Sequence, residues 1–259
     1  MSAILLDITD GVARITLNRP KAYNSVNKEL AHGFQSALDS CAADSSVRVL
    51  CITGEGKAFC AGQDLVEVTT PETMPGFKAL LEEHYAPIIM KIRELEKPVV
   101  AAVNGVAAGA GANIALACDI VVATERASFI QAFSGIGLIP DSGGTYFLPR
   151  LVGFQKAVAI SMLGDKISAK EAEDMGMIYK AIPVEEYEDT VQGLLKRLST
   201  MPTKGLALTK KAFSESLSNT LAEQIAVENA AQITASETAD YTEGVQAFLE
   251  KRKPQFKGK

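Results

Sequence analysis

The feature that most constrains the fold is a stretch of very small residues in the middle of the chain. Residues 101–120, AAVNGVAAGAGANIALACDI, contain eight alanines and three glycines before Asp119 and follow a β-rich run. Side chains this small allow another part of the molecule to approach the backbone closely. Gly105, Gly109 and Gly111 can take backbone angles that other residues avoid, and the alanine-rich run after Gly109 predicts a helix that starts there.

A helix start of this kind carries unpaired N–H groups, which can hold an oxyanion or a phosphate. Close packing of a helix on a sheet explains the same residues, and this segment alone favours that simpler interpretation. The segment is not a P-loop, because no Lys-Ser/Thr pair follows, and the spacing after Gly109 does not fit GxGxxG.

Strand and helix patterns alternate in the first half of the chain. Period-two apolar positions on either side of Asp10-Gly11 predict a hairpin of half-buried strands: Ile4, Leu6 and Ile8, then Ala13, Ile15 and Leu17. Two strand–helix cycles follow. Their helix faces are Leu30, Phe34, Leu38 and Cys41, and then Leu81, Tyr85, Ile88, Ile92 and Leu95; their strands are 47–53 and 98–103.

From about residue 150 the chain is mostly helical, with one apolar stripe at Val191, Leu194, Leu195 and Leu198 and another at Tyr241, Val245, Phe248 and Leu249. No linker or strict repeat interrupts it. We expect an α/β core with a helical C-terminal part.

The charge balance excludes several classes of protein. The chain has 26 basic and 31 acidic side chains, a net charge of −5, so it is a poor candidate for binding nucleic acid or an anionic membrane. No basic leader or bilayer-length apolar run is present, and we expect a soluble cytoplasmic protein. Four scattered cysteines and two histidines match neither a redox pair nor a zinc site, so buried reduced thiols and no metal are expected.

Two further stretches could carry chemistry. GKAFCAGQDL, residues 56–65, is a second small-residue turn that could bring another N–H donor, so that two turns form an oxyanion hole. Asp64 is equally explained as a surface charge or helix cap, and Cys60 as a packed thiol without a histidine base. GIGLIPDSGG, residues 135–144, places Asp141 among apolar residues, where a raised pKa would suit a general acid or base. A helix N-cap explains Asp141 about as well.

Five motifs in this order resemble the enoyl-CoA hydratase/isomerase (crotonase) family: NRPKAYNS, FCAGQDL, KPVVAAVNGVAAGAG, CDIVVA and GLIPDSGGT. The resemblance covers essentially the whole chain. It implies a crotonase-type spiral core of ββα units with the CoA and acyl site, residues 1–200, and a C-terminal helical region that trimerises, residues 201–259. It also implies an acyl-CoA thioester ligand, and a homotrimer or a dimer of trimers.

The same resemblance implies roles for individual residues. The backbone amides of Gln63 and Ala110 would form the oxyanion hole for the thioester oxygen. Substrate and CoA contacts would come from Lys21, Ala22, Ala61, Gln63, Asp64, Leu65 and Gly109, with Asn113 and Phe133 beside the acyl group. The tail residues Phe256 and Lys259 would reach the CoA of a neighbouring subunit.

Departures from the family pattern point to the reaction. Hydratases of the family use two glutamates, and those positions here are Asn113 and Phe133, which cannot act as carboxylate bases. Asp141 stands where isomerase branches carry an acidic residue, and one carboxylate is sufficient to move a proton between carbons. Phe133, Tyr146 and Phe147 could line an aromatic acyl pocket, and core packing explains them about as well.

Within the family, GVAAGAGA, AFSGIGLIPDSGGTYFLPR and ADYTEGVQAFLEKRKPQFKGK resemble a branch that isomerises the ring epoxide of a phenylacetyl thioester to an oxepin; related members shift a 3-enoyl double bond to the 2-position. We therefore expect an acyl-CoA isomerase with Asp141 as its acid/base. A hydratase with unconventional residues and a non-catalytic binding protein are the alternatives. No metal or redox cofactor is expected, because a proton shift needs neither. CoA would arrive as part of the substrate.

Overall fold

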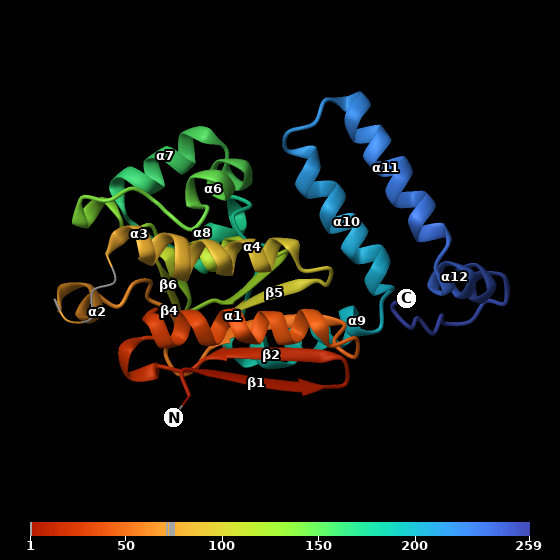
Figure 1. The fold of residues 1–259 in the computed structure, drawn as a ribbon, viewed down its shortest axis with the longest axis horizontal. Coiled ribbons are helices and arrows are strands. Elements are labelled where there is room, and N and C mark those ends of the chain that lie inside the picture. Colours follow the sequence, from red (N-terminus) through yellow and green to blue (C-terminus); the bar gives the residue numbers. More distant parts are fainter. Residues whose placement is uncertain (1, 71, 73–75) are drawn as a thin grey trace.

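In the computed structural model, which describes residues 2–70, 72 and 76–259, two sheets share the strands of the first two thirds of the chain (Figure 1). The larger sheet has the order β1-β2-β3-β5-β7-β10, with bounds Ile4–Thr9, Val12–Leu17, Val49–Gly54, Val99–Val103, Ile120–Thr124 and Lys180–Ile182. The smaller has the order β4-β6-β8-β9, with bounds Ala58–Cys60, Val106–Ala108, Ser128–Ile130 and Lys166–Ser168.

From β3 to β8, consecutive strands alternate between the two sheets. β3, β5 and β7 pair in parallel in the larger sheet, and the strands that directly follow them, β4, β6 and β8, pair in parallel in the smaller one. After β4 and β6, a helical segment returns the chain to the larger sheet, whereas α6 and α7 after β8 lead to β9 of the smaller sheet. This arrangement confirms the predicted ββα units, although their sequences show no strict repeat.

Twelve α-helices surround these sheets within the described residues. Their bounds are α1 Lys28–Ala43, α2 Leu65–Thr69, α3 Phe77–Ala79, α4 Ala86–Glu94, α5 Ala110–Leu116, α6 Gly144–Val152, α7 Phe154–Leu163, α8 Ala169–Asp174, α9 Tyr187–Ser199, α10 Thr203–Ser216, α11 Leu221–Ser236 and α12 Ala239–Leu249. A π-type helical turn, Leu80–Tyr85, leads into α4, and 3₁₀ turns cover Pro20–Ala22, Ser134–Ile136 and Val184–Glu186.

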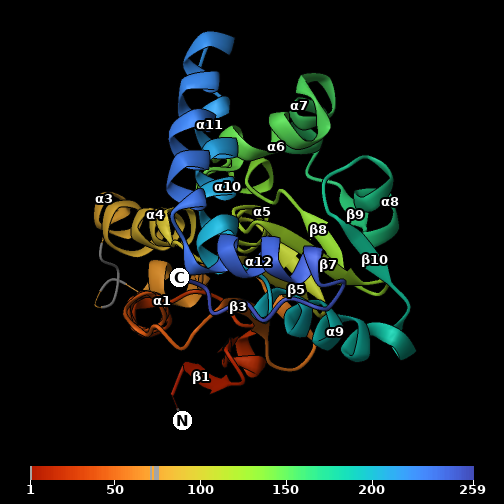
Figure 2. The same ribbon diagram turned by 90° about the vertical axis from the view of Figure 1, so that its right-hand side faces the viewer.

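Both faces of the larger sheet are covered, which is why its central strands consist of buried residues throughout. Leu50 and Ile52 of β3 belong to the core cluster that contains α1 and α4, whereas Val49 and Cys51 face the cluster that contains α9. Figure 2 shows α9 on the far side of the sheet from α1 and α4. The predicted apolar faces of α1 and α9 are confirmed.

Three predicted apolar patterns, in the hairpin, before α4 and in α12, are not fully buried. The hairpin forms, but β1 is the edge strand, so Leu6 and Ile8 are exposed and only Ile4 of the three is buried. Leu81 is likewise exposed, ahead of α4.

The second C-terminal stripe also remains on the surface. Tyr241, Val245, Phe248 and Leu249 of α12 are all exposed, and α10 and α11 run side by side away from the body of the molecule (Figure 1). Helical periodicity therefore predicted α12 correctly but not a buried face. The division of the chain at residue 200 stays a prediction.

Candidate active site

The site is organised by one edge of the smaller sheet. Strands β4, β6 and β8 run parallel, so their carboxyl ends lie at the same edge, which is where open α/β sheets bind ligands. Gln63 follows β4, Ala110 follows β6, and Phe133 follows β8. Three of the predicted site residues are thus brought together by parallel pairing between segments separated by 20 to 50 positions along the chain.

The turns after β4 and β6 touch each other. A Cβ added at Gly111 would lie 2.2 Å from the carbonyl oxygen of Cys60, and one added at Gly62 would lie 2.8 Å from the carbonyl oxygen of Ala108 and 3.4 Å from the amide nitrogen of Ala110. The close approach that the small residues predict is confirmed.

The three glycines of the central segment serve two different needs. Gly109, at the N-cap of α5, has a φ of +54° and uses the conformational freedom that was predicted. Gly105 and Gly111 have ordinary backbone angles, so that prediction is wrong for them. They are required for space, because a Cβ at Gly105 would lie 2.1 Å from the carbonyl oxygen of Lys57.

Two backbone amides are left unpaired where these turns meet. The isolated bridge between Val26 and Gln63 uses the carbonyl of Gly62 and the amide of Asp64, at 2.7 Å and 2.9 Å from Val26, and so leaves the Gln63 amide out. Ala110 is the first residue of α5 and has no partner four residues earlier in the helix. Within residues 2–70, 72 and 76–259, neither amide donates a hydrogen bond.

The side chain of Gln63 is held on both sides. The Tyr85 hydroxyl donates to its Oε1 at 2.8 Å, and its Nε2 donates to Glu67 at 3.1 Å. Tyr85 is almost fully buried, and burial first, with Cys60 and Asp141 nearby, raises its pKa well above the ordinary value. We expected only a helix-face residue here, and nothing in its sequence neighbourhood distinguishes it from one.

Asp141 lies in the loop that precedes α6. Its carboxylate accepts a hydrogen bond from the Ser142 hydroxyl at 2.9 Å. Burial raises its pKa above the ordinary value, and the hydrogen bond from Ser142 lowers it by a smaller amount. A carboxylate of raised pKa is a stronger base than an ordinary aspartate, which suits a group that takes up and returns a proton.

The alternative role of Asp141 as a helix cap is not observed, because α6 begins at Gly144 with Gly143 as its N-cap. The apolar residues flanking Asp141 in sequence do not bury it either, since Leu138 and Ile139 are exposed. Ser142 has a φ of +50°, a conformation that costs energy for a non-glycine residue.

Asn113 and Phe133 are both buried beside the start of α5. Asn113 donates from Nδ2 to the carbonyl oxygen of Asp141 at 2.8 Å, which ties the aspartate loop to α5. The Phe133 ring lies 3.8 Å from the Cβ position of Gly109, at its Cζ atom. Neither position holds a carboxylate, as the sequence requires.

A cavity of about 1310 Å³ opens next to Asp141, between α4, α6 and α10. Ser142, Gly143, Tyr146 and Phe147 line it from the aspartate side, and Tyr85 lines it from the side of the π-type turn. Tyr146 and Phe147 pack edge to face with ring centroids 5.3 Å apart. Two of the three predicted acyl-pocket aromatics therefore border open space, and Phe133 lies at Gly109.

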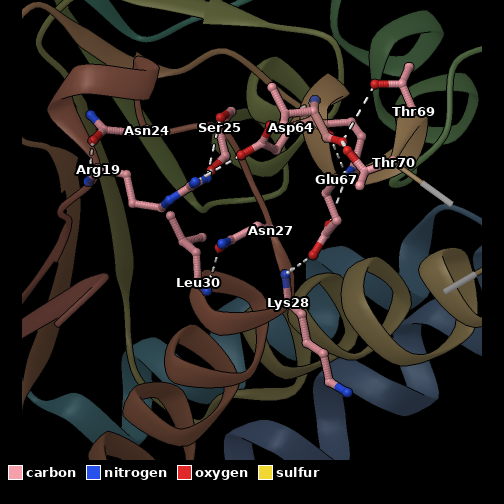
Figure 3. Close-up of polar contacts among 12 residues, drawn as sticks. Arg19, Asn24, Ser25, Asn27, Lys28, Leu30, Asp64, Glu67, Thr69 and Thr70 are labelled. Atoms are coloured by element: carbon pink, nitrogen blue, oxygen red, sulfur yellow. Dashed lines mark hydrogen bonds and ion pairs between the residues drawn. The ribbon is translucent and has the colours of Figure 1, made fainter. Parts of the chain in front are cut away.

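Asp64, one of the predicted CoA contacts, forms an ion pair with Arg19 (Figure 3). Arg19 donates to the carbonyl oxygen of Ser25 at 2.6 Å and to Oδ2 of Asp64 at 2.8 Å, while Oδ1 of Asp64 caps α2 by accepting from the Val66 amide at 3.0 Å. The helix-cap interpretation of Asp64 is confirmed. Lys21 in the Pro20–Ala22 turn, and Leu65 at the start of α2, are exposed.

Other predicted contact residues take their places along the same turns. Ala22 is half-buried in the 3₁₀ turn, and the Ala61 amide donates to the carbonyl oxygen of Tyr23 at 3.0 Å. Their contacts with CoA, like those of Lys21, Leu65 and Gly109, stay predictions.

The C-terminal tail is tied to its own chain. Buried Asp240 accepts from the amides of Lys257 and Gly258 at 2.6 Å and 2.7 Å, and Arg48 donates to the carbonyl oxygen of Phe256 at 3.4 Å. The amide of Asp240 donates in turn to the carbonyl oxygen of Lys259 at 3.3 Å. Contact of Phe256 or Lys259 with a neighbouring subunit's CoA stays a prediction.

The cysteines are free and buried, as predicted. Burial raises the pKa of the Cys60 thiol to about 11, so it is a poor nucleophile at neutral pH. The described part of the chain has no group of three or more His, Cys, Asp or Glu side chains that could hold a metal ion. None of its helices is long and apolar enough to cross a bilayer.

Comparison with known proteins agrees with this geometry. The family model for enoyl-CoA hydratase/isomerase matches residues 7–259. The chain is 45% identical to the 1,2-epoxyphenylacetyl-CoA isomerase of Escherichia coli, with all of both chains covered. It is 34% identical to the trans-2-decenoyl-[acyl-carrier-protein] isomerase of Streptococcus mutans, covering 99% of this chain and 98% of the other.

Among solved structures, an enoyl-CoA hydratase from Bacillus anthracis superposes with a TM-score of 0.91 at 33% identity, covering 99% of this chain and 100% of the other. The motifs, the paired sheets and the full-length matches all agree. The chain belongs to the enoyl-CoA hydratase/isomerase family.

Proposed function

We propose that this protein is an acyl-CoA isomerase in which Asp141 moves a proton between two carbons of the acyl group. The observation that carries the proposal is the set of side chains around the start of α5. One carboxylate of raised pKa stands there, and the two positions at which hydratases of the family use glutamates hold Asn113 and Phe133, both buried. A single carboxylate suits proton transfer, whereas hydration needs a second group to position water.

The backbone supplies the complementary half of the mechanism. When the Asp141 carboxylate removes a proton from the carbon next to the thioester, the electron pair moves onto the carbonyl oxygen. The Gln63 and Ala110 amides then stabilise this enolate. Each such donor is typically worth about 2.7–4 kcal/mol of barrier stabilisation. The protonated Asp141 returns its proton to a different carbon, so the product has the same mass as the substrate.

For the acyl group, we propose a 1,2-epoxyphenylacetyl thioester, with a 3-enoyl to 2-enoyl shift as a related activity. In the ring epoxide, the carbon–carbon bond shared by the epoxide and the six-membered ring breaks as the ring double bonds shift, so that the oxygen joins a seven-membered oxepin ring. Asp141 moves a proton from the carbon next to the thioester to a ring carbon, and the mass is unchanged. The full-length similarity to a 1,2-epoxyphenylacetyl-CoA isomerase supports the aromatic substrate. The aromatic side chains of Tyr146 and Phe147 in the wall of the adjoining cavity support it further, because ring-on-ring contacts favour a flat aryl group.

The CoA portion would lie along the turns near the Arg19–Asp64 ion pair, in contact with Lys21, Ala22, Ala61 and Leu65. We also propose a homotrimer or a dimer of trimers, assembled through the C-terminal helices. The exposed apolar residues of α12, with Phe248 82% and Leu249 69% exposed, support this assembly. Monomeric proteins rarely expose a large contiguous apolar patch to water. Sedimentation equilibrium should give three or six times the mass of one chain.

A product assay tests the reaction. Wild type and Asp141→Asn are each given 2-enoyl-CoA, 3-enoyl-CoA and freshly prepared 1,2-epoxyphenylacetyl-CoA, and products are followed by mass spectrometry and absorbance. We expect isomers of unchanged mass from the last two substrates, and a loss of at least about 10²-fold in kcat for Asp141→Asn. Asp189→Asn on α9, an exposed aspartate on the opposite face of the larger sheet, is the matched control.

Addition of one water to 2-enoyl-CoA by both proteins would show a hydratase that does not need Asp141. Isomerisation that survives in Asp141→Asn would remove Asp141 from the mechanism. The ratio of the ring-epoxide rate to the 3-enoyl rate decides between the two acyl groups.

A further inference from the structure

Two buried amide side chains connect the end of β8 to the backbone of Asp141. Gln131, the residue after β8, donates from Nε2 to Oδ1 of Asn113 at 2.8 Å. Asn113, in α5, donates from Nδ2 to the carbonyl oxygen of Asp141 at 2.8 Å. Gln131 is 3% exposed and Asn113 is fully buried. We call Gln131 and Asn113 the amide relay.

The direction of the relay is set by hydrogen-bond chemistry. A backbone carbonyl oxygen can only accept, so Asn113 must present its NH₂ group to Asp141 and its oxygen to Gln131. Gln131 must then present its own NH₂ group. Turning either amide over would place two oxygens against each other.

The relay leaves one buried acceptor unsatisfied. Oε1 of Gln131 has no hydrogen-bond partner among the described residues. Buried polar atoms without partners destabilise a fold, so the glutamine carries this cost while its Nε2 group supplies the donor that Oδ1 of Asn113 accepts. Core packing by itself therefore gives no reason for a glutamine at this position, whereas a requirement for its donor does.

The segment held by the relay has few other restraints. Apolar residues on the N-terminal side of Asp141 are exposed, and Ser142 on the other side has a left-handed backbone conformation. The Asp141 carbonyl accepts from Asn113 and from the Gly144 amide, both at 2.8 Å. A Cβ at Gly144 would lie 2.3 Å from Nδ2 of Asn113, so the glycine permits this close contact.

We propose that Gln131 and Asn113 are positioning residues for the reaction, which hold the Asp141 backbone against α5 and so set the carboxylate relative to the Gln63 and Ala110 amides. The inference rests on the proposed function, because it assigns the relay to the group proposed as the base. Neither relay residue needs to touch the substrate.

The relay predicts that Gln131→Met lowers kcat without lowering stability. This substitution removes the unpaired oxygen of Gln131 but leaves Oδ1 of Asn113 without a donor, so one unsatisfied buried acceptor replaces another. We expect the urea midpoint of unfolding to stay close to that of wild type. We expect kcat to fall by about 10-fold or more, and KM to change by less than about threefold, because the change affects placement of the base rather than ground-state binding.

Gln224→Met is the control. Like Gln131, Gln224 donates one hydrogen bond from its side-chain amide, in this case to the backbone carbonyl of Ala212 at 3.1 Å, but it lies on α11. It should keep the wild-type kcat. Asn113→Leu should lower kcat at least as much as Gln131→Met and should also lower stability, because it strands the Nε2 group of Gln131. The double variant Asn113→Leu/Gln131→Met should recover part of that stability without recovering kcat.

The outcomes separate this proposal from the proposed function. If Asp141→Asn is inactive but Gln131→Met keeps kcat within about twofold of wild type, the relay has no positioning role and the isomerase proposal stands. If Gln131→Met loses stability and activity in proportion, the relay is structural. If Asp141→Asn retains its turnover, the proposed function itself fails. A fall in kcat at unchanged stability in Gln131→Met, together with an inactive Asp141→Asn, supports both.

Discussion

Gly111→Ala tests the contact between the two turns that carry the proposed oxyanion hole. The added Cβ would lie 2.2 Å from the carbonyl oxygen of Cys60 and 2.7 Å from the Cβ of Cys60. Carbon and oxygen atoms in close contact are usually about 3.3–3.6 Å apart, so the start of α5 and the end of β4 must separate by about 1 Å. Neither side can yield easily, since one is a helix backbone and the other a strand end.

The expected magnitudes follow from that displacement. Overpacking of a well-packed site costs about 1–3 kcal/mol, and the better helix propensity of alanine offsets up to about 1 kcal/mol. We therefore expect a net loss of about 2 kcal/mol in the free energy of unfolding. Displacement of a catalytic group by about 1 Å can lower the rate about 10²-fold, so kcat for isomerisation should fall by roughly that factor.

Gly193→Ala is the matched control. Gly193 also lies within a helix, α9, but a Cβ there would meet nothing within 4 Å. Its replacement should raise stability by up to about 1 kcal/mol and leave kcat unchanged. Urea unfolding and steady-state kinetics on all three proteins supply the comparison. If Gly111→Ala gained as much stability as Gly193→Ala and kept its turnover, our account of the contact between the two turns would be wrong.

Three further predictions concern other parts of the site and its support. Because burial raises the pKa of Asp141, kcat/KM should fall as the pH drops through a value above the ordinary aspartate pKa of about 3.9; a pH profile with no acidic limb above that value would contradict this assignment. Tyr85→Phe removes the hydrogen bond to Gln63 and should lower kcat about 10-fold at nearly constant KM, measured by steady-state kinetics; equal kcat values would show that the Gln63 amide is set by the backbone alone. Buried Lys97 donates to carbonyls at the end of α1, so Lys97→Met should cost about 1–3 kcal/mol in urea unfolding without changing kcat, and a loss of activity in the folded variant would contradict its purely structural role.

Local patterns in the sequence were sufficient for much of the fold. The N-terminal hairpin, α1 and α9 follow from the spacing of apolar residues, because burial of one helix face or one strand face leaves a periodic signature. The motifs indicated the family from the same linear information. Period alone could not show that β1 is an edge strand, since an alternating pattern is the same whether its apolar face is covered or not.

The sequence also indicated the chemistry of the candidate site. Small residues at 101–112 and 56–65 predicted two backbone segments in close contact. Asp141 was a candidate acid or base because it is a carboxylate flanked in the sequence by apolar residues and glycines. These are properties of residue type, which a linear reading preserves. The prediction that Gly105 and Gly111 take unusual backbone angles was wrong. Each is a glycine because a neighbouring segment lies too close for a side chain, and that distance depends on the packing of distant segments.

The tertiary structure alone decided which side chains meet. Gln131 reaches Asn113 across 18 positions, and Asn113 reaches Asp141 across 28, through the parallel register of β6 and β8 and the packing of α5. Tyr85, in the π-type turn before α4, likewise contacts Gln63, which is 22 positions away in the sequence. A sequence by itself determines periodicity, turn chemistry and the residues available for catalysis. The partners of a buried polar group depend on strand register and helix placement, which are settled only when distant segments pack against one another.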